Sequence, residues 1–295
     1  MSERHIAEET ETAFDLSKKA CNNLFKEHDK NEIDGIIFCT QSPDYIMPSN
    51  SFLLHNYLGL KDEVFAFDFN HACTGYIYAL SMAHSFITAG LARQVLLVNA
   101  DTYSKYINKN DRSTRVLFGD AAACTIVEGS SNSRGIIDIA LASSGKDYDK
   151  FWIQAGGMRM PRSAQTAAEV SDESGNIRCQ ENITMSGLEV WSFINSVVPK
   201  QISNLLSRNS VQPDEIDLFV FHQASQMTLD SIIRKLELDR EKVFINIQDV
   251  GNTVSASIPI ALKDAMRMGR VVHGNRIVLS GFGVGLSYGS ILMNL

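Results

Sequence analysis

The chain has 295 residues, of which 44% are hydrophobic and 21% charged, so it can bury one or two large apolar cores. Its formal net charge of -7 provides no general attraction to nucleic acid or to an anionic membrane surface. Its apolar runs are too short to cross a bilayer and its first residues form no signal-peptide segment, so we expect a cytoplasmic protein that binds neither nucleic acid nor membrane.

Short apolar runs rich in β-branched residues predict buried strands along the whole chain. These strands cover residues 35–40, 64–69, 94–99, 121–127, 217–221, 243–247, 276–280 and 286–293. Apolar side chains at helical spacing predict helices over residues 74–89 and 253–268, each followed by a glycine. This alternation predicts an α/β architecture in which helices cover the sheets.

The two parts of the chain resemble each other. The strand, turn and helix around Cys73 recur around Asn252, and the strand before Gln41 resembles the strand before Gln223 at nearly the same offset. Chance similarity between two α/β segments is the alternative, but the shared order of elements favours an internal duplication. We therefore predict an N-terminal half over residues 1–145 and a C-terminal half over residues 187–295.

Residues 146–186, between the halves, are polar and show no sustained periodicity. A loose surface loop is one interpretation. Aromatic and methionine side chains favour a second one, in which the segment packs as a cap over a substrate channel. These side chains are Phe151, Trp152, Met158 and Met160.

Cys73 follows the strand at 64–69 and precedes the helix at 74–89. The N-terminus of a helix favours a thiolate, the reactive form of cysteine, so we predict a nucleophile here. The other four cysteines, Cys21, Cys39, Cys124 and Cys179, have no spacing typical of a disulfide framework or a metal site. Cys39 and Cys124 lie within apolar strands and are expected to be buried, whereas we place Cys21 on a helix face and Cys179 in a loop. All five are expected to be free thiols.

Two further residues are catalytic candidates. His222 ends the strand at 217–221, where α/β folds place reacting side chains, although a histidine of the core is the simpler alternative. Asn252 occupies the duplicate position of Cys73 and could donate a hydrogen bond to a developing negative charge, or simply cap a helix. An imidazole near a reactive thiol would exchange its proton, which favours the catalytic reading.

A glycine-rich run, Gly281 to Gly285, superficially resembles a dinucleotide-binding motif. The chain continues as a strand and not as the required phosphate-binding helix, which excludes that interpretation. The glycines instead allow the backbone to approach a ligand or to offer an N–H group to an oxyanion, with a plain tight turn as the alternative.

Together these four elements resemble the β-ketoacyl-acyl-carrier-protein synthase III family of the thiolase superfamily. Supporting matches are the segments E-R-H-I-A at residues 3–7, F-G-D-A-A at 118–122 and M-S-G at 185–187. The resemblance implies a thiolase-like fold of two βαβαβαββ-like halves stacked as five layers (αβαβα), assembled as a homodimer. It also implies an opening strand and helix before residue 3, which this sequence does not carry.

The resemblance further implies a decarboxylative condensation. Cys73 would accept the acyl group of an acyl-coenzyme A, and His222 and Asn252 would stabilise the enolate formed when malonyl-acyl-carrier protein loses carbon dioxide. Backbone N–H groups of Cys73, Gly283 and Val284 would stabilise the tetrahedral oxyanion. Coenzyme A enters as part of a substrate, and no cofactor or metal is implied.

Other family positions are implied to contact the substrates. Arg112 would lie near the coenzyme A adenine, although Ser113 replaces the glycine that follows in the family. Arg234 and Lys235 would dock the carrier protein, and Met47 would reach across the dimer toward the acyl pocket. Trp191 and Ser225 would contact the substrate, although the family often has an asparagine where Ser225 stands.

Two other functions stay open from the sequence. A relative of this kind could transfer its acyl group to a small-molecule acceptor without condensation, or could be a non-catalytic partner subunit that binds acyl thioesters. A degradative thiolase is disfavoured, because no cysteine follows His222 to serve as the second reactive thiol of those enzymes.

Overall fold

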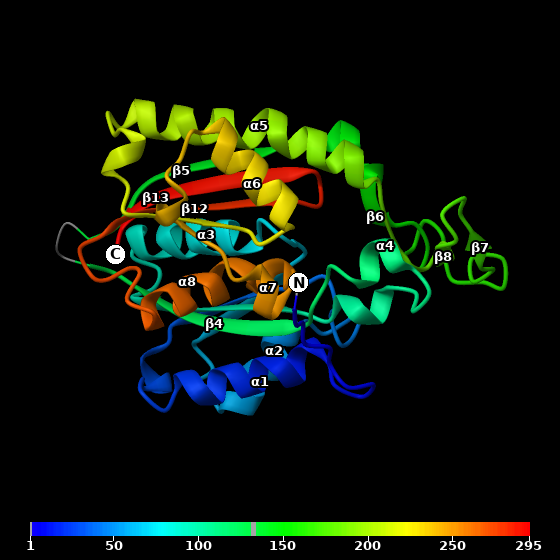
Figure 1. The fold of residues 1–295 in the computed structure, drawn as a ribbon. Helices are drawn as coiled ribbons and strands as arrows, with labels where there is room; N and C mark the ends of the chain where they lie inside the picture. Colours follow the sequence, from blue (N-terminus) through cyan, green and yellow to red (C-terminus); the bar gives the residue numbers. More distant parts are fainter. Residues whose placement is uncertain (1, 131–133) are drawn as a thin grey trace.

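The computed structural model describes residues 2–130 and 134–295, which form five alternating layers (Figure 1). Helices α1 (Ala13–Leu24) and α2 (Asn50–Leu58) cover the outer face of a first sheet. Helices α5 (Gly187–Arg208) and α6 (Gln226–Lys235) cover the outer face of a second sheet, whereas α3 (Gly75–Thr88) and α8 (Ser257–Arg267) lie between the two sheets. The predicted αβαβα layering is therefore confirmed.

The first four strands of each sheet share one order, which supports the internal duplication, and the second sheet has a fifth strand at its edge. The first contains, in order, β2 (Phe65–Phe69), β1 (Gly35–Cys39), β3 (Gln94–Asp101) and β4 (Ala121–Glu128). The second contains β11 (Val243–Phe244), β10 (Leu218–Phe221), β12 (Arg276–Gly283), β13 (Ser287–Asn294) and β5 (Gly135–Ser143). In each sheet the first three strands are parallel and the fourth is antiparallel to the third.

Alternating side chains of the central strands fill separate cores on the two faces of each sheet. In β1, Ile36 and Phe38 belong to the cluster under α1 and α2, whereas Ile37 belongs to the middle cluster. Helix α3 contributes Ile77 and Leu80 to that middle cluster, together with strands of both sheets. Because α3 is covered by a sheet on each side, its sequence is apolar around much of its circumference.

Short elements connect this framework. They are the helices α4 (Arg112–Arg115) and α7 (Ile247–Val250), and the 3₁₀ turns η1 (Lys30–Glu32), η2 (Tyr103–Tyr106), η3 (Gly145–Lys150), η4 (Pro213–Glu215), η5 (Arg240–Lys242) and η6 (Val254–Ala256). No helix in the described ranges is long and apolar enough to cross a membrane.

Residues 146–186 form a small structured excursion at one end of the molecule (Figure 1). Strand β6 (Phe151–Ile153) pairs with β9 (Ile183–Met185), and β7 (Val170–Ser171) pairs with β8 (Ile177–Arg178). The segment packs in part, as predicted, because Phe151 is buried whereas the Met158 side chain is 91% exposed.

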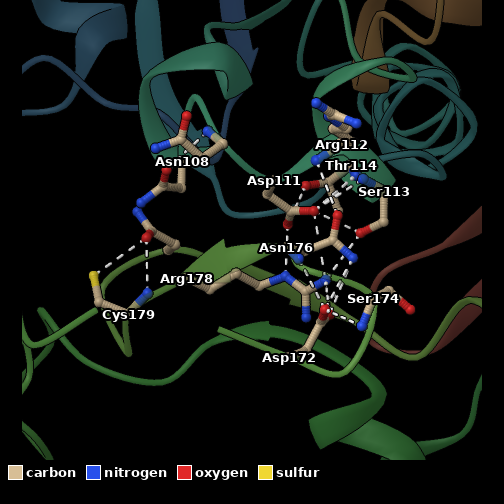
Figure 2. Close-up of polar contacts among 12 residues, drawn as sticks. Asn108, Asp111, Arg112, Ser113, Thr114, Asp172, Ser174, Asn176, Arg178 and Cys179 are labelled. Atoms are coloured by element: carbon tan, nitrogen blue, oxygen red, sulfur yellow. Dashed lines mark hydrogen bonds and ion pairs between the residues drawn. The ribbon is translucent and has the colours of Figure 1, made fainter. Parts of the chain in front are cut away.

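An ion pair fastens this excursion to α4 (Figure 2). Arg178 Nε lies 2.6 Å from Asp111 Oδ2, and Arg178 also pairs with Asp172 at 3.0 Å. Burial alone would raise the pKa of Asp111, but hydrogen bonds from Arg178, Ser113 and Thr114 outweigh it and lower the pKa to about 2.

This pair predicts a pH-dependent contribution to stability. The folded pKa of Asp111 lies below the unfolded value of about 3.9, so its contribution is complete above that value and is lost as the pH falls toward 2. We expect Asp111→Asn to lower the unfolding midpoint at pH 7, and the difference from the natural chain to shrink as the pH falls from 5 to 3. Denaturant unfolding at several pH values measures this, with the exposed Glu173→Gln as control. A difference independent of pH would contradict the assignment.

Candidate active site

A single cavity of about 300 Å³ brings the three catalytic candidates together. Cys73 lies just before α3, His222 follows β10, and Asn252 lies in the turn before η6. The parallel strands of each half end at one side of their sheet, so residues far apart in sequence reach the same cavity. Trp191, Ser225 and Gly283 line it too.

Two glycines of β12 allow the second half to approach Cys73 closely. A Cβ atom built on Gly283 would lie 2.8 Å from Cys73 Sγ, and one built on Gly281 would lie 2.6 Å from the carbonyl oxygen of Cys73. Both distances are shorter than real Cβ contacts allow. The glycine run therefore serves the close approach of the backbone to the nucleophile, whereas its approach to a ligand and its N–H group for an oxyanion stay predictions.

This contact predicts that Gly283→Ala loses activity while the fold persists. The added methyl group would displace the Cys73 side chain, so we expect acylation of Cys73 to slow by about 10²-fold, as misplacing a reacting atom by about 1 Å can do. Quench-flow measurement of acyl transfer from acyl-coenzyme A tests it. Gly145→Ala is the matched control, because a Cβ there meets no atom within 4 Å. Unchanged acylation in Gly283→Ala would show that the sulfur does not depend on this contact.

The resting state of Cys73 differs from the sequence-based expectation. Burial raises the pKa of its thiol to about 12, although backbone N–H groups of Val284 and of Cys73 itself oppose the rise. The expectation of a resting thiolate was therefore wrong. The side chain is only 3% exposed, so the cost of desolvating a negative sulfur outweighs the helix terminus.

His222 is also uncharged. Burial lowers its pKa to about 3, and its ring packs edge-on against Phe282 at a centroid distance of 5.6 Å. Within the described ranges its Nδ1 atom has no hydrogen-bond partner. The cavity thus contains a neutral thiol and a neutral imidazole, a pair that can exchange one proton when a substrate arrives.

Asn252 is held by its backbone and presents its carboxamide. Its N–H donates to the carbonyl oxygen of Leu117 at 2.9 Å, and its carbonyl oxygen accepts from Gly119 at 2.9 Å. Its Oδ1 accepts from the N–H of Val254 at 3.0 Å, whereas its Nδ2 makes only a long contact of 3.4 Å with the carbonyl oxygen of Ala224. The amide N–H groups are therefore the part of this side chain with donating capacity to spare.

The other predicted residues are spread more widely. Val284 lines a second cavity of about 320 Å³, which Gln41, Tyr103 and Trp152 also border. Arg112 is exposed beside the excursion of residues 146–186 (Figure 2), where its backbone N–H donates to Asn176 Oδ1 at 3.1 Å. Met47 is 80% exposed, in the loop before α2.

The predicted carrier-docking pair lies on α6. Both residues are exposed, and Lys235 Nζ donates to the carbonyl oxygen of Asn195 in α5 at 2.8 Å. None of Arg112, Met47, Arg234 and Lys235 lines either cavity. Their roles toward the substrates stay predictions.

Two family models and several known proteins match this chain over most of its length. Residues 67–145 match the family model described as 3-Oxoacyl-[acyl-carrier-protein (ACP)] synthase III, and residues 206–295 match the model of its C-terminal part. The β-ketoacyl-[acyl-carrier-protein] synthase III of Campylobacter fetus subsp. fetus is 38% identical over 293 residues, which cover 98% of this chain and 86% of that relative. The chain belongs to the 3-oxoacyl-[acyl-carrier-protein] synthase III family.

Other members of the synthase III family are similarly close. That of Clostridium perfringens is 35% identical over 286 residues, covering 97% of this chain and 84% of the relative. A crystal structure of a 3-oxoacyl-(acyl-carrier-protein) synthase III superposes with a TM-score of 0.96 at 38% identity, covering 99% of this chain and 88% of that one. The enzyme from Thermus thermophilus superposes with a TM-score of 0.87 at 32% identity, covering 99% and 87%.

Proposed function

We propose that the protein condenses the acyl group of an acyl-coenzyme A with malonyl-acyl-carrier protein, giving a 3-oxoacyl-carrier protein, coenzyme A and carbon dioxide. Membership of the synthase III family supports this reaction. The observation that carries it is the meeting of Cys73, His222 and Asn252 in one cavity, since each step of the reaction needs one or more of these groups.

In the first half-reaction the sulfur of Cys73 attacks the thioester carbonyl, and coenzyme A leaves. The thiol proton departs in step with the attack, because a resting thiolate is disfavoured in this cavity. Neutral His222 is the available acceptor and can pass the proton to the leaving thiolate. We propose that the backbone N–H groups of Cys73, Gly283 and Val284 stabilise the tetrahedral oxyanion, and those of Cys73 and Val284 already interact with the resting sulfur.

In the second half-reaction the malonyl group loses carbon dioxide and its thioester oxygen takes the negative charge. His222 and Asn252 would donate hydrogen bonds to that oxygen. The resulting carbanion attacks the acyl carbon on Cys73, which forms the new carbon–carbon bond and breaks the carbon–sulfur bond, and the Cys73 thiolate that leaves takes up one proton from solvent. Apart from that proton, groups of the chain and its substrates suffice for every step, so we propose no metal or prosthetic group.

The family also suggests an assembly and peripheral contacts. We propose a cytoplasmic homodimer in which Met47 approaches the partner's acyl pocket. Tyr45, Ile46 and Met47 form an exposed apolar loop tip with exposures of 59%, 89% and 80%, which supports burial against a second subunit. Arg112 is proposed to contact the coenzyme A adenine, and Arg234 and Lys235 to meet the acidic carrier protein.

The reaction is tested with purified protein, a series of acyl-coenzymes A of increasing chain length, and malonyl-acyl-carrier protein. Intact-mass measurement reports acylation of the chain, and mass analysis of the carrier protein reports the 3-oxoacyl product. Both products are expected with at least one chain length. Acylation without condensation would favour transfer to another acceptor, and binding without acylation would favour a non-catalytic role.

A further inference from the structure

Asp101 is a buried carboxylate outside both cavities that joins the two halves beside the active site. It ends β3 and is 0% exposed. One carboxylate oxygen, Oδ1, accepts from the backbone N–H of Gln41 at 2.8 Å. The other, Oδ2, accepts from the backbone N–H of Ser255 at 3.3 Å and from the Ser255 hydroxyl group. The carboxylate therefore binds the end of one half to the catalytic turn of the other.

The turn that Asp101 contacts has a strained backbone. Val254, two residues after Asn252, has φ of 53° and is fully buried. A β-branched residue rarely adopts this left-handed conformation, which persists only where the surroundings enforce it. Two sets of contacts do so: Asn252 Oδ1 accepts from the N–H of Val254, and Asp101 holds Ser255.

The internal duplication supports a role at the active site. Asp101 is the last residue of β3 and Gly283 is the last residue of β12, and these strands hold the same place in the two sheets. Gly283 approaches Cys73 just before α3, and Asp101 contacts Ser255 just before α8. In each half, the end of the third strand in the sheet therefore contacts the catalytic turn of the other half.

We infer that Asp101 is a positioning residue that fixes Ser255, and through it the strained Val254 turn, so that the Asn252 carboxamide points into the cavity. The positioning role itself does not depend on the proposed function. Only its expected effect on the rate of decarboxylation rests on that function. Asp101 lines neither cavity and so has no direct contact with substrate. A loosened turn would misplace the Asn252 amide while Cys73 and its glycine contacts stay in place.

The test compares Asp101→Asn with Asp68→Asn. The asparagine keeps the shape of Asp101 but replaces one of its two acceptor oxygens with an NH2 group, so it cannot accept from both Gln41 and Ser255. Asp68 likewise accepts from two backbone N–H groups, those of Asn50 and Ser51, at the start of α2. We expect Asp101→Asn to slow decarboxylation of malonyl-carrier protein by about tenfold or more and acylation of Cys73 by less than about threefold. Asp68→Asn is expected to change neither rate. Equal loss in both half-reactions, or no loss, would overturn the inference.

Rescue provides a second measurement. Val254→Gly removes the backbone strain, so Asp101→Asn is expected to cost less in that background than in the natural chain. Should Asp101→Asn not fold, Ser255→Ala removes the same hydroxyl contact and carries the same expectation and the same overturning outcomes.

A readout independent of catalysis separates this inference from the proposed function. In ¹⁵N-labelled protein, the side-chain amide signal of Asn252, assigned with Asn252→Ala, is expected to shift or broaden in Asp101→Asn and not in Asp68→Asn. If malonyl-carrier protein is not a substrate but this signal responds, the proposed function fails and the positioning role stands. An unchanged signal would overturn the positioning role.

Discussion

The Cys73→Ala protein is expected to take up no acyl group and to lose condensation by at least about 10³-fold, because no other residue in the cavity can form the thioester. Intact-mass measurement after incubation with acyl-coenzyme A reads this directly. The natural chain should gain one acyl mass, and the variant none.

A second cysteine variant serves as the control. Cys179 is a half-buried loop thiol whose Sγ lies 3.2 Å from Asn182 Oδ1, and Cys179→Ala should acylate as the natural chain does. If Cys73→Ala retained the full covalent acylation, the nucleophile would lie elsewhere and the mechanism proposed above would be wrong.

The second large effect concerns the two hydrogen-bond donors. We expect His222→Ala and Asn252→Ala each to slow decarboxylation by about 10²–10³-fold, the usual cost of removing a donor to a developing oxyanion. Acylation of Cys73 should fall less, above all in Asn252→Ala, since this amide has no proton to transfer. Release of carbon dioxide from labelled malonyl-carrier protein measures one step, and the rate of acyl uptake measures the other.

The pH dependence gives a further check on the same residues. Because burial lowers the pKa of His222 to about 3, the imidazole is neutral from pH 5 upward. The rate of decarboxylation should therefore show no decrease between pH 7 and pH 5 that depends on His222.

The comparison of the two variants has its own contrary outcome. If His222→Ala and Asn252→Ala each slowed both half-reactions equally, the separate roles of the two donors would be disproved.

Much of the fold could be predicted because its strands are short, apolar and regularly interrupted. Most predicted strands are present, but the segment at 243–247 pairs only over β11 (Val243–Phe244), since Ile247 begins α7. Strand β5 was not predicted: it pairs with β13 on one side only, and its partly buried side chains show no clear alternation. The long helix α5 was not predicted either, because a proline inside a helix weakens the sequence pattern typical of one. The structure nevertheless has Pro199 within α5, with its side chain buried.

The site was predicted from local patterns, and its electrostatics were not. The positions of Cys73, His222 and Asn252 at strand and helix ends follow from sequence, and the cavity contains all three. The protonation of Cys73 could not be foreseen, because the helix terminus is visible in the sequence whereas the burial around the sulfur depends on both halves. Asp101 was also missed, since its partner Ser255 lies 154 residues away and no local motif links them.

The glycines that bring β12 against Cys73 have a wider consequence. The nucleophile belongs to one half and the backbone that packs against it belongs to the other, so the geometry around Cys73 depends on how the two halves pack together. Activity therefore depends on the contact between the two halves. A substitution that moves β12 away from Cys73 by about 1 Å is expected to lower activity before it unfolds the protein.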